Sequence, residues 1–197
     1  MAPAPDHALR VGFVTGATPD KWAGVWRERY PRERLDLVPV REEDQEALLR
    51  GGSLDLALVR LPVETAGLHR IPLYDEVPVV VAAVDHFVAA ADEVLLADLR
   101  DEQLVRPHRS GWRPDADQLP WPEMTEREAI ETVASGTGVV LVPLSVARLY
   151  ARKDVVHRPV TDLAPTTVAL AWLVERDDEQ TQRFVGVVRG RSPRSSR

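Results

Sequence analysis

The chain has 197 residues, 44% of them hydrophobic, and a formal net charge of −6. This length allows one domain or two small lobes, and the negative charge argues against a body that binds nucleic acid through electrostatics. The absence of cysteine excludes disulfides and thiolate chemistry. Neither a signal peptide nor an apolar run of about 18 residues is present, so we expect a cytoplasmic protein with no membrane partner.

The first part of the chain alternates strands and helices. A strand is predicted over 9–14, followed by a helix with Thr18 as N-cap and Pro19 in its first position. Three further elements follow: a strand around 35–38, a helix over 43–50 that ends at Gly51 and Gly52, and a strand over 54–59. This order is typical of a parallel sheet that is covered on both faces.

The second part changes in character. Residues 108–122 are rich in Pro, Trp, Arg and Asp without periodicity, which predicts a loop. Thr125 and Glu128 form a capping-box pattern that opens a helix ending at Gly136. The other predicted elements are strands over 68–73, 77–84, 103–106, 139–142, 155–156 and 168–174, a helix from Ser145 as its cap to Tyr150, and a closing helix over 180–189.

Several fragments, in this order and spacing, carry a family resemblance. They include LLRGGSLDLALVRLP, GLHRIPLYDE and EAIETVASGTGVVLVPLSVARL. From about Leu9 to about Gly186 the chain resembles the effector-binding domain of LysR-type transcriptional regulators. The resemblance implies an α/β fold of the periplasmic-binding-protein type II kind, with two lobes joined by two crossing strands at 77–84 and 168–174. It also implies a small ligand in the cleft between the lobes.

The resemblance sets the expected domains. Lobe I is expected over 8–80 plus 166–190, lobe II over 81–165, and a basic, disordered tail over 191–197. Two features depart from the family. The sequence starts at the first strand without a helix-turn-helix, so we expect a protein without that head. The long helix expected between the 103–106 strand and Thr125 is absent, which shortens lobe II and leaves the family's homodimer open.

Candidate ligand-binding residues follow from the ends of strands. In open parallel sheets ligands lie beyond the carboxyl ends of the strands, and a helix N-terminus there favours an anion. The candidates are Thr15, Gly16, Ala17, Thr18, Arg60, Pro107, His108, Thr125 and Glu126. We therefore predict a small organic acid or another anionic metabolite as ligand.

These candidates also have plainer interpretations. Thr18 and Thr125 are good N-caps that need no further role. Arg60 could pair with Asp55 or Glu64 on the surface, and Glu126 could select an amine or hydroxyl instead of an anion. Two tryptophans, Trp112 and Trp121, could form a ligand lid or a partner surface, or simply cover a small lobe.

The C-terminal tail suggests a second function. Arg189, Gly190, Arg191 and Arg194 resemble an AT-hook, which inserts arginine into the narrow minor groove of A·T-rich DNA. Ser192 stands where the hook has proline. The alternative is therefore an interaction protein with a degenerate cleft, which contacts DNA through this tail or binds a protein partner.

Catalytic patterns are weak, so we expect no enzyme, metal or cofactor. The five histidines have no metal-ligand spacing, and there is no nucleophile elbow or phosphate-binding loop. A dehydratase on this fold would have to use Glu126, His108 or Thr15 as its acid or base. Because fold does not fix function, the enzyme stays a third hypothesis.

Overall fold

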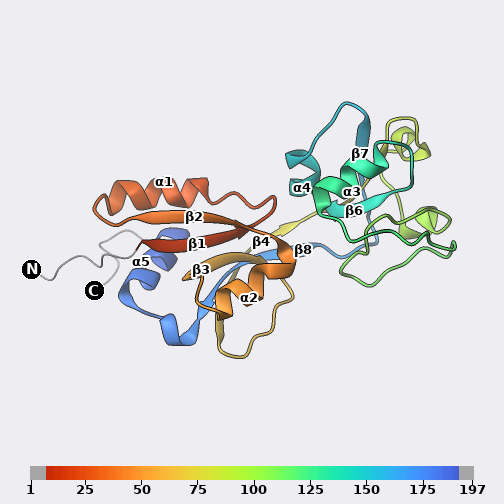
Figure 1. The fold of residues 1–197 in the computed structure, drawn as a ribbon. Helices are drawn as coiled ribbons and strands as arrows, with labels where there is room; N and C mark the ends of the chain where they lie inside the picture. The colour runs from red at the N-terminus through yellow and green to blue at the C-terminus, as the bar shows by residue number, and fades with distance from the viewer. Residues whose placement is uncertain (1–7, 191–197) are drawn as a thin grey trace, which may run out of the picture. The chain divides into compact units, whose positions relative to one another are not determined.

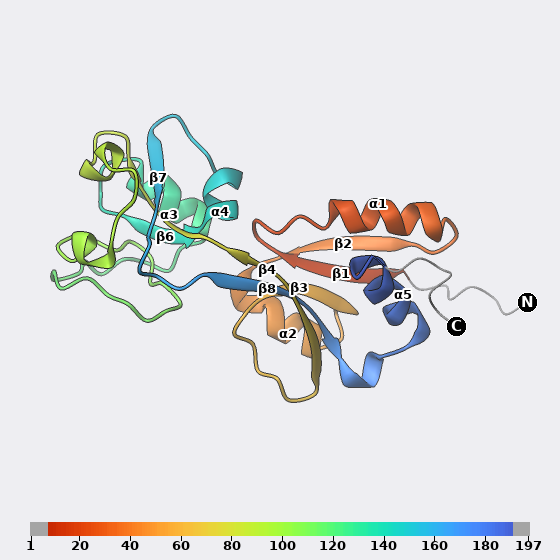
Figure 2. The same ribbon diagram turned by 180° about the vertical axis from the view of Figure 1, so that it is seen from behind.

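The structure is a computed structural model that describes residues 8–190 (Figures 1 and 2). The chain divides into two compact units. Unit 1 combines the chain up to Tyr74 with the chain from Thr167 onward, and unit 2 is Asp75–Thr166. Among the described residues, no helix has the length and apolar character that a membrane span requires.

Unit 1 is built on a five-stranded sheet in the order β2-β1-β3-β8-β4. Strand β1 pairs in parallel with β2 and β3, and β8 runs antiparallel to β3. This confirms the predicted parallel arrangement of the first three strands. The elements are β1 (Leu9–Val14), α1 (Asp20–Arg29), β2 (Leu35–Val40), the 3₁₀ helix η1 (Glu42–Asp44), α2 (Gln45–Arg50), β3 (Leu56–Arg60), β4 (Leu68–Glu76), β8 (Thr166–Leu173), η4 (Val174–Arg176) and α5 (Glu179–Val188).

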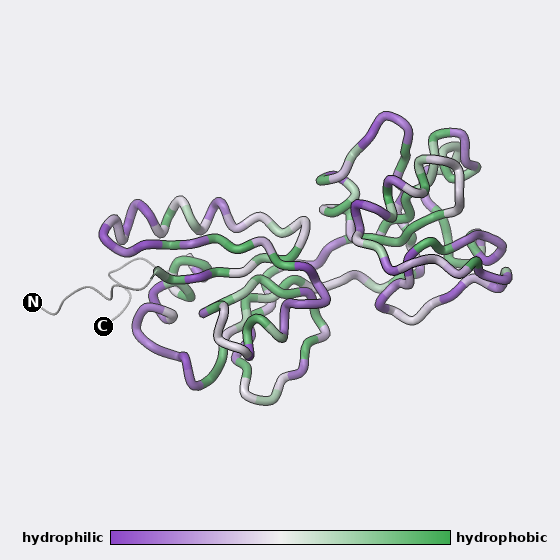
Figure 3. Tube along the Cα trace, in the orientation of Figure 1, coloured by the Kyte–Doolittle hydropathy of each residue, from purple (hydrophilic) through white to green (hydrophobic). Residues whose placement is uncertain are grey.

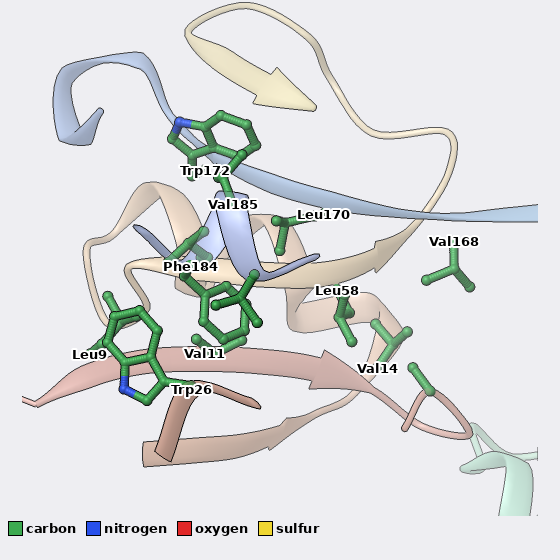
Figure 4. Packing of buried hydrophobic residues seen from close by; sticks show 13 residues of the cluster. Leu9, Val11, Val14, Trp26, Leu58, Val168, Leu170, Trp172, Phe184 and Val185 are labelled. Carbon is green, nitrogen blue, oxygen red and sulfur yellow. The ribbon is translucent and has the colours of Figure 1, made fainter. Parts of the chain in front are cut away.

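Two apolar layers cover the two faces of this sheet. On one face Trp26 of α1 lies against Phe184 of α5, with ring centroids 5.7 Å apart, over Val11 and Leu170 of the strands (Figure 4). On the other face Leu49 of α2 packs with residues of β3 and β8. The hydropathy trace follows this division, because hydrophobic residues gather along the inner strands and hydrophilic ones along the outer turns (Figure 3).

Unit 2 has a smaller, antiparallel sheet in the order β6-β5-β7. Helices α3 and α4 cover one face through Ile130, Val133 and Val146. Short 3₁₀ helices and a long irregular segment cover the other face, where Trp112 packs. The elements are β5 (Pro78–Ala83), η2 (Phe87–Ala90), η3 (Leu96–Leu99), α3 (Glu126–Val133), β6 (Val140–Pro143), α4 (Leu144–Leu149) and β7 (Val155–Pro159).

The chain passes between the units in β4 and at the start of β8. The predicted crossing at 77–84 is wrong, because that segment is β5 and lies wholly within unit 2. Strand β4 is longer than the apolar pattern suggested and carries the crossing past Tyr74. The second predicted crossing, at 168–174, falls in β8, which begins at Thr166 beside the boundary.

Two local predictions in unit 2 are also wrong. Ser145 does not cap α4, because the helix begins at Leu144 with Pro143 as N-cap, and the Ser145 hydroxyl donates to the buried carboxylate of Glu76. The predicted strand over 103–106 is a single bridge between Leu104 and Val139. The segment over 108–122 contains neither helix nor strand, as predicted.

Candidate functional site

The carboxyl-terminal edge of the unit 1 sheet brings three chain segments together. Because β1 and β2 are parallel with Val14 opposite Val40, the residues after these two strands lie at the same edge. The end of β3 lies there as well, since β3 is parallel to β1. The edge is therefore formed by residues 15–18, by η1 and by Arg60.

Arg60 is fully buried at this edge. Its Nη2 donates to the carbonyl oxygen of Thr15 at 2.6 Å, and its Nη1 lies 3.3 Å from Oε2 of Glu42. Surface pairing of Arg60 is therefore a wrong prediction. Asp55, one of the two carboxylates suggested for it, lies near Arg10 and Arg176, at 3.0 and 2.7 Å.

The backbone of Arg60 is held as firmly as its side chain. The amide of Gln45, which is buried, donates to the Arg60 carbonyl at 3.0 Å and accepts from the Arg60 N–H at 2.9 Å. These bonds tie the end of β3 to the start of α2. Since the guanidinium also holds the Thr15 carbonyl, Arg60 fixes the loop that leads into α1.

Helix α1 begins one residue later than predicted, and Thr18 is not its cap. Pro19 occupies the N-cap position, and no side chain caps the helix. Thr18 is exposed beside this start, while Gly16 has a φ of 88°, a conformation that other residues rarely adopt. The first N–H groups of a helix have no acceptor within it. In α1 the N–H groups of Trp22 and Ala23 bond to the Pro19 carbonyl at 3.0 and 2.9 Å, so the donors that remain at its start are those of Asp20 and Lys21.

The charge of Arg60 is balanced locally by Glu42. Nearby, Arg41 is paired with Asp44 at 2.6 Å. An anion at this edge would therefore depend on backbone N–H groups and the dipole of α1 more than on a spare guanidinium.

The corresponding helix start in unit 2 is closed. The Thr125 hydroxyl accepts from the N–H of Glu128 at 3.3 Å, and the Glu128 carboxylate accepts from the N–H of Thr125 at 2.8 Å. This confirms the predicted capping box. The Thr125 bonds hold the pKa of Glu128 below its usual value, and they use both the hydroxyl and the first N–H.

Glu126 and Arg106 form a partly buried pair at the same place. Glu126 is buried, and its Oε1 lies 3.2 Å from Nη2 of Arg106. Arg106 also donates to the carbonyl of Met124 at 3.0 Å. These contacts bring the segment with Pro107 and His108 to the start of α3, so the four unit 2 candidates share one region.

His108 forms a local turn in that region. Its Nδ1 accepts from the N–H of Ser110 at 3.2 Å and lies 2.9 Å from the Ser110 hydroxyl. Burial lowers the pKa of His108 to about 4, and the charges of Arg109 and Arg106 add to this shift. At neutral pH the ring is uncharged, which makes it a hydrogen-bonding group and no counter-ion.

The structure describes only part of the AT-hook-like tail. Arg189 follows α5 as its C-cap and Gly190 has a φ of 69°, whereas Arg191 and Arg194 lie outside the described residues. Within residues 8–190 no cluster of three or more His, Asp or Glu side chains could hold a metal ion.

Sequence reasoning missed Glu42, Gln45 and Arg106. Each acts through a partner distant in sequence, and the only local signal was the position of Arg106 directly after an apolar run.

Comparison with known proteins gives consistent results. Residues 4–193 match the family model described as "LysR substrate binding domain". The Hca operon transcriptional activator HcaR of Escherichia coli is 29% identical over 94% of this chain and 68% of its own length. A probable hydrogen peroxide-inducible genes activator of Mycobacterium avium is 34% identical over 74% of this chain and 52% of its own.

Solved structures show the same fold. The BenM effector binding domain with its effector benzoate has a TM-score of 0.74 at 21% identity, covering 95% of this chain and 92% of that one. A mutant of OxyR from Corynebacterium glutamicum has a TM-score of 0.72 at 25% identity, covering 94% of this chain and 65% of that one.

Proposed function

The chain belongs to the LysR substrate-binding-domain family, and we propose that it senses a small carboxylate at the Thr15–Thr18 loop and thereby modulates transcription. The family match confirms the resemblance drawn from the sequence. The relatives named above are transcriptional activators, which favours a regulator over an enzyme.

One observation carries the choice of site and ligand class. Helix α1 begins without a side-chain cap next to a loop whose carbonyl at Thr15 is held by buried Arg60. A fixed loop beside unsatisfied N–H groups at the positive end of a helix dipole suits a carboxylate. Because Glu42 already balances Arg60, a ligand with one negative charge suits the edge better than a dianion.

The ligands of the relatives support a small molecule but not its identity. The BenM domain has benzoate as its effector, and other relatives are named for hydrogen peroxide-inducible genes. Sensing of peroxide through thiol oxidation requires cysteine, and this chain has none. A reversibly bound organic acid is therefore the better hypothesis for this chain.

The proposal retains further predictions from the sequence. Pro107, His108, Thr125 and Glu126, all in unit 2, remain predicted as ligand-binding residues. The chain spans 68% and 52% of the two curated relatives, so contact with DNA, the oligomeric state and the cytoplasmic location of the whole protein are likewise proposals.

The test is a thermal-shift screen of the intact protein with monocarboxylates, dicarboxylates, phosphates and amino acids. A ligand at a hundred times its Kd stabilises the folded state by about 2.7 kcal/mol, which raises the melting temperature by several degrees. Thr18→Glu places a carboxylate at the exposed start of α1. We expect it to leave the melting temperature unchanged or higher and to remove most of the ligand-induced shift.

Ser53→Glu is the matched control. Ser53 is also exposed and belongs to unit 1, but it precedes β3 and so lies toward the opposite edge of the sheet. The control should keep the full ligand response. An equal loss in both variants would contradict binding at α1, and stabilisation by dicarboxylates alone would contradict the ligand class.

A further inference from the structure

Unit 2 contains a pocket of about 240 Å³, which shares only Pro107 with the residues proposed above to contact the sensed ligand. It is formed by the irregular segment between η3 and α3, which Figure 1 shows in green and which includes Leu104, the residue bridged to Val139. The pocket is larger than the roughly 150 Å³ cavity that can hold a benzene ring. Its walls are formed by Leu104, Pro107, Arg113, Pro114, Gln118, Leu119, Pro120 and Trp121.

The irregular segment is fixed by side-chain bonds although it has no helix or strand. Gln118 accepts from the N–H of Leu104 at 2.7 Å and donates to the carbonyl of Glu102 at 3.0 Å. The side chain of Gln103 bonds in turn to the residues on either side of Gln118. It accepts from the N–H of Leu119 at 2.9 Å and donates to the carbonyl of Asp117 at 2.9 Å. The pocket walls are therefore formed before any ligand arrives, which lowers the cost of binding.

The unpaired polar side chains at the pocket are donors. Both N–H groups of the Gln118 amide are already engaged, since its nitrogen donates to the carbonyl of Ala116 at 2.9 Å as well as to that of Glu102. Arg113 is exposed, and within residues 8–190 its guanidinium has no hydrogen-bond or ion-pair partner. The indole N–H of Trp121 is buried and also lacks a partner in the described chain.

The remaining wall is apolar and unusually open to a ligand. Leu119 is 53% exposed, a high value for a large apolar side chain beside a pocket, and three prolines make the wall stiff. Burial of a ring against these groups removes apolar area from water. A ligand must therefore combine a small ring with a group that accepts hydrogen bonds and needs no acceptor in return.

We propose that this pocket is a second ligand site, which binds a small aromatic monocarboxylate with its ring against Leu119 and the prolines. The carboxylate pairs with Arg113, and a tilt of the Trp121 ring lets the indole N–H donate to it. This site lies wholly within unit 2 and is independent of the α1 edge, so it stands or falls separately from the proposed sensing function.

The experiment measures benzoate binding to the full chain by ligand-observed NMR titration. All measurements use the Thr18→Glu background, which suppresses binding at α1. Acetate, which lacks the ring, and benzyl alcohol, which lacks the charge, serve as comparison probes. We expect benzoate to bind at least roughly tenfold more tightly than either, because both the apolar and the charged contacts are needed.

Two variants locate the site. Arg113→Met should weaken benzoate binding roughly tenfold, because a charge-assisted hydrogen bond is lost. Trp121→Phe, which keeps an aromatic wall and removes the N–H, should weaken it about threefold. Arg100→Met is the control, since this arginine is also exposed and starts the same irregular segment but does not line the pocket.

The outcomes are distinguishable. Loss of benzoate in Arg113→Met with retention in Arg100→Met supports the second site. No benzoate binding in the Thr18→Glu background, equal effects of the two arginine variants, or equal affinity for acetate would each overturn it. Circular dichroism of each variant checks that the fold is intact, and Arg113→Met answers the question even if Trp121→Phe does not fold.

Discussion

The starts of α1 and α3 differ in how they satisfy their free N–H groups. Helix α3 uses its own side chains, through the reciprocal bonds of Thr125 and Glu128. Helix α1 has Pro19 at the same position and no side-chain cap. Both helices have the same dipole, so the difference lies in what remains unsatisfied. A helix start whose N–H groups are bonded by its own side chains stabilises the fold. A helix start that keeps unbonded N–H groups is the better candidate for binding a ligand.

The largest expected effect on stability concerns Arg60, which fixes the loop that leads into α1. Arg60→Met leaves the Glu42 carboxylate and the Thr15 carbonyl without this buried donor, and it should lower the free energy of unfolding by about 3 kcal/mol. Arg41→Met, at an exposed pair on the same edge, should cost about 0.5 kcal/mol. Urea unfolding of the two variants compares them. Equal losses would mean that Arg60 is no more important to the edge than a surface arginine.

A smaller effect separates the two helix starts directly. Thr125→Ala removes the capping hydroxyl of α3 and should destabilise the protein by about 1 kcal/mol. Thr18→Ala removes an exposed hydroxyl that caps nothing, and it should change the stability by less than about 0.3 kcal/mol. Denaturant midpoints at equal slope give both values. A cost for Thr18→Ala as large as that for Thr125→Ala would contradict the open start of α1.

The smallest effect at neutral pH is expected at His108. Its pKa is about 4 in the folded protein against 6.5 ordinarily, so between these values the unfolded chain binds more protons. The stabilising contribution is therefore complete above pH 6.5 and is lost as the pH falls toward 4.

Around pH 7.5, the free energy of unfolding of His108→Gln should depend on pH in the same way as that of the wild type. Between pH 6.5 and 4, the variant should lose less stability than the wild type. Urea unfolding across this range tests the slope. The pKa of His157 is also lowered by burial, so His157→Gln is the control that shows how much of the slope belongs to each ring. A wild-type slope in His108→Gln would contradict the assignment.

Elements with a strong local pattern could be predicted from the sequence. The alternation over 9–59 predicted β1, α1, β2, α2 and β3 within a few residues, because each pattern is set by nearest neighbours. The capping box at Thr125 was predicted for the same reason, since its partner is three residues away. The loop over 108–122 could be predicted from its composition.

What could not be predicted depends on distant partners. Arg60 meets Glu42 across 18 residues and Thr15 across 45, so nothing near Arg60 in the sequence indicates a buried arginine. The bonds of Gln103 and Gln118, 14 to 16 residues from their partners, likewise turn a loop of irregular composition into a fixed wall. Such contacts exist only once the chain has folded.

The position of β8 has a consequence for synthesis. This strand lies between β3 and β4 in the unit 1 sheet, yet all of it except its first residue, Thr166, comes after unit 2 in the chain. A ribosome therefore delivers every residue of unit 2 before it delivers the rest of the strand and the helix, with Phe184, that complete unit 1. Unit 1 is therefore begun first and completed last. A nascent chain halted near Thr166 would contain all of unit 2, but β4 would lack β8, the strand that joins it to the rest of the unit 1 sheet.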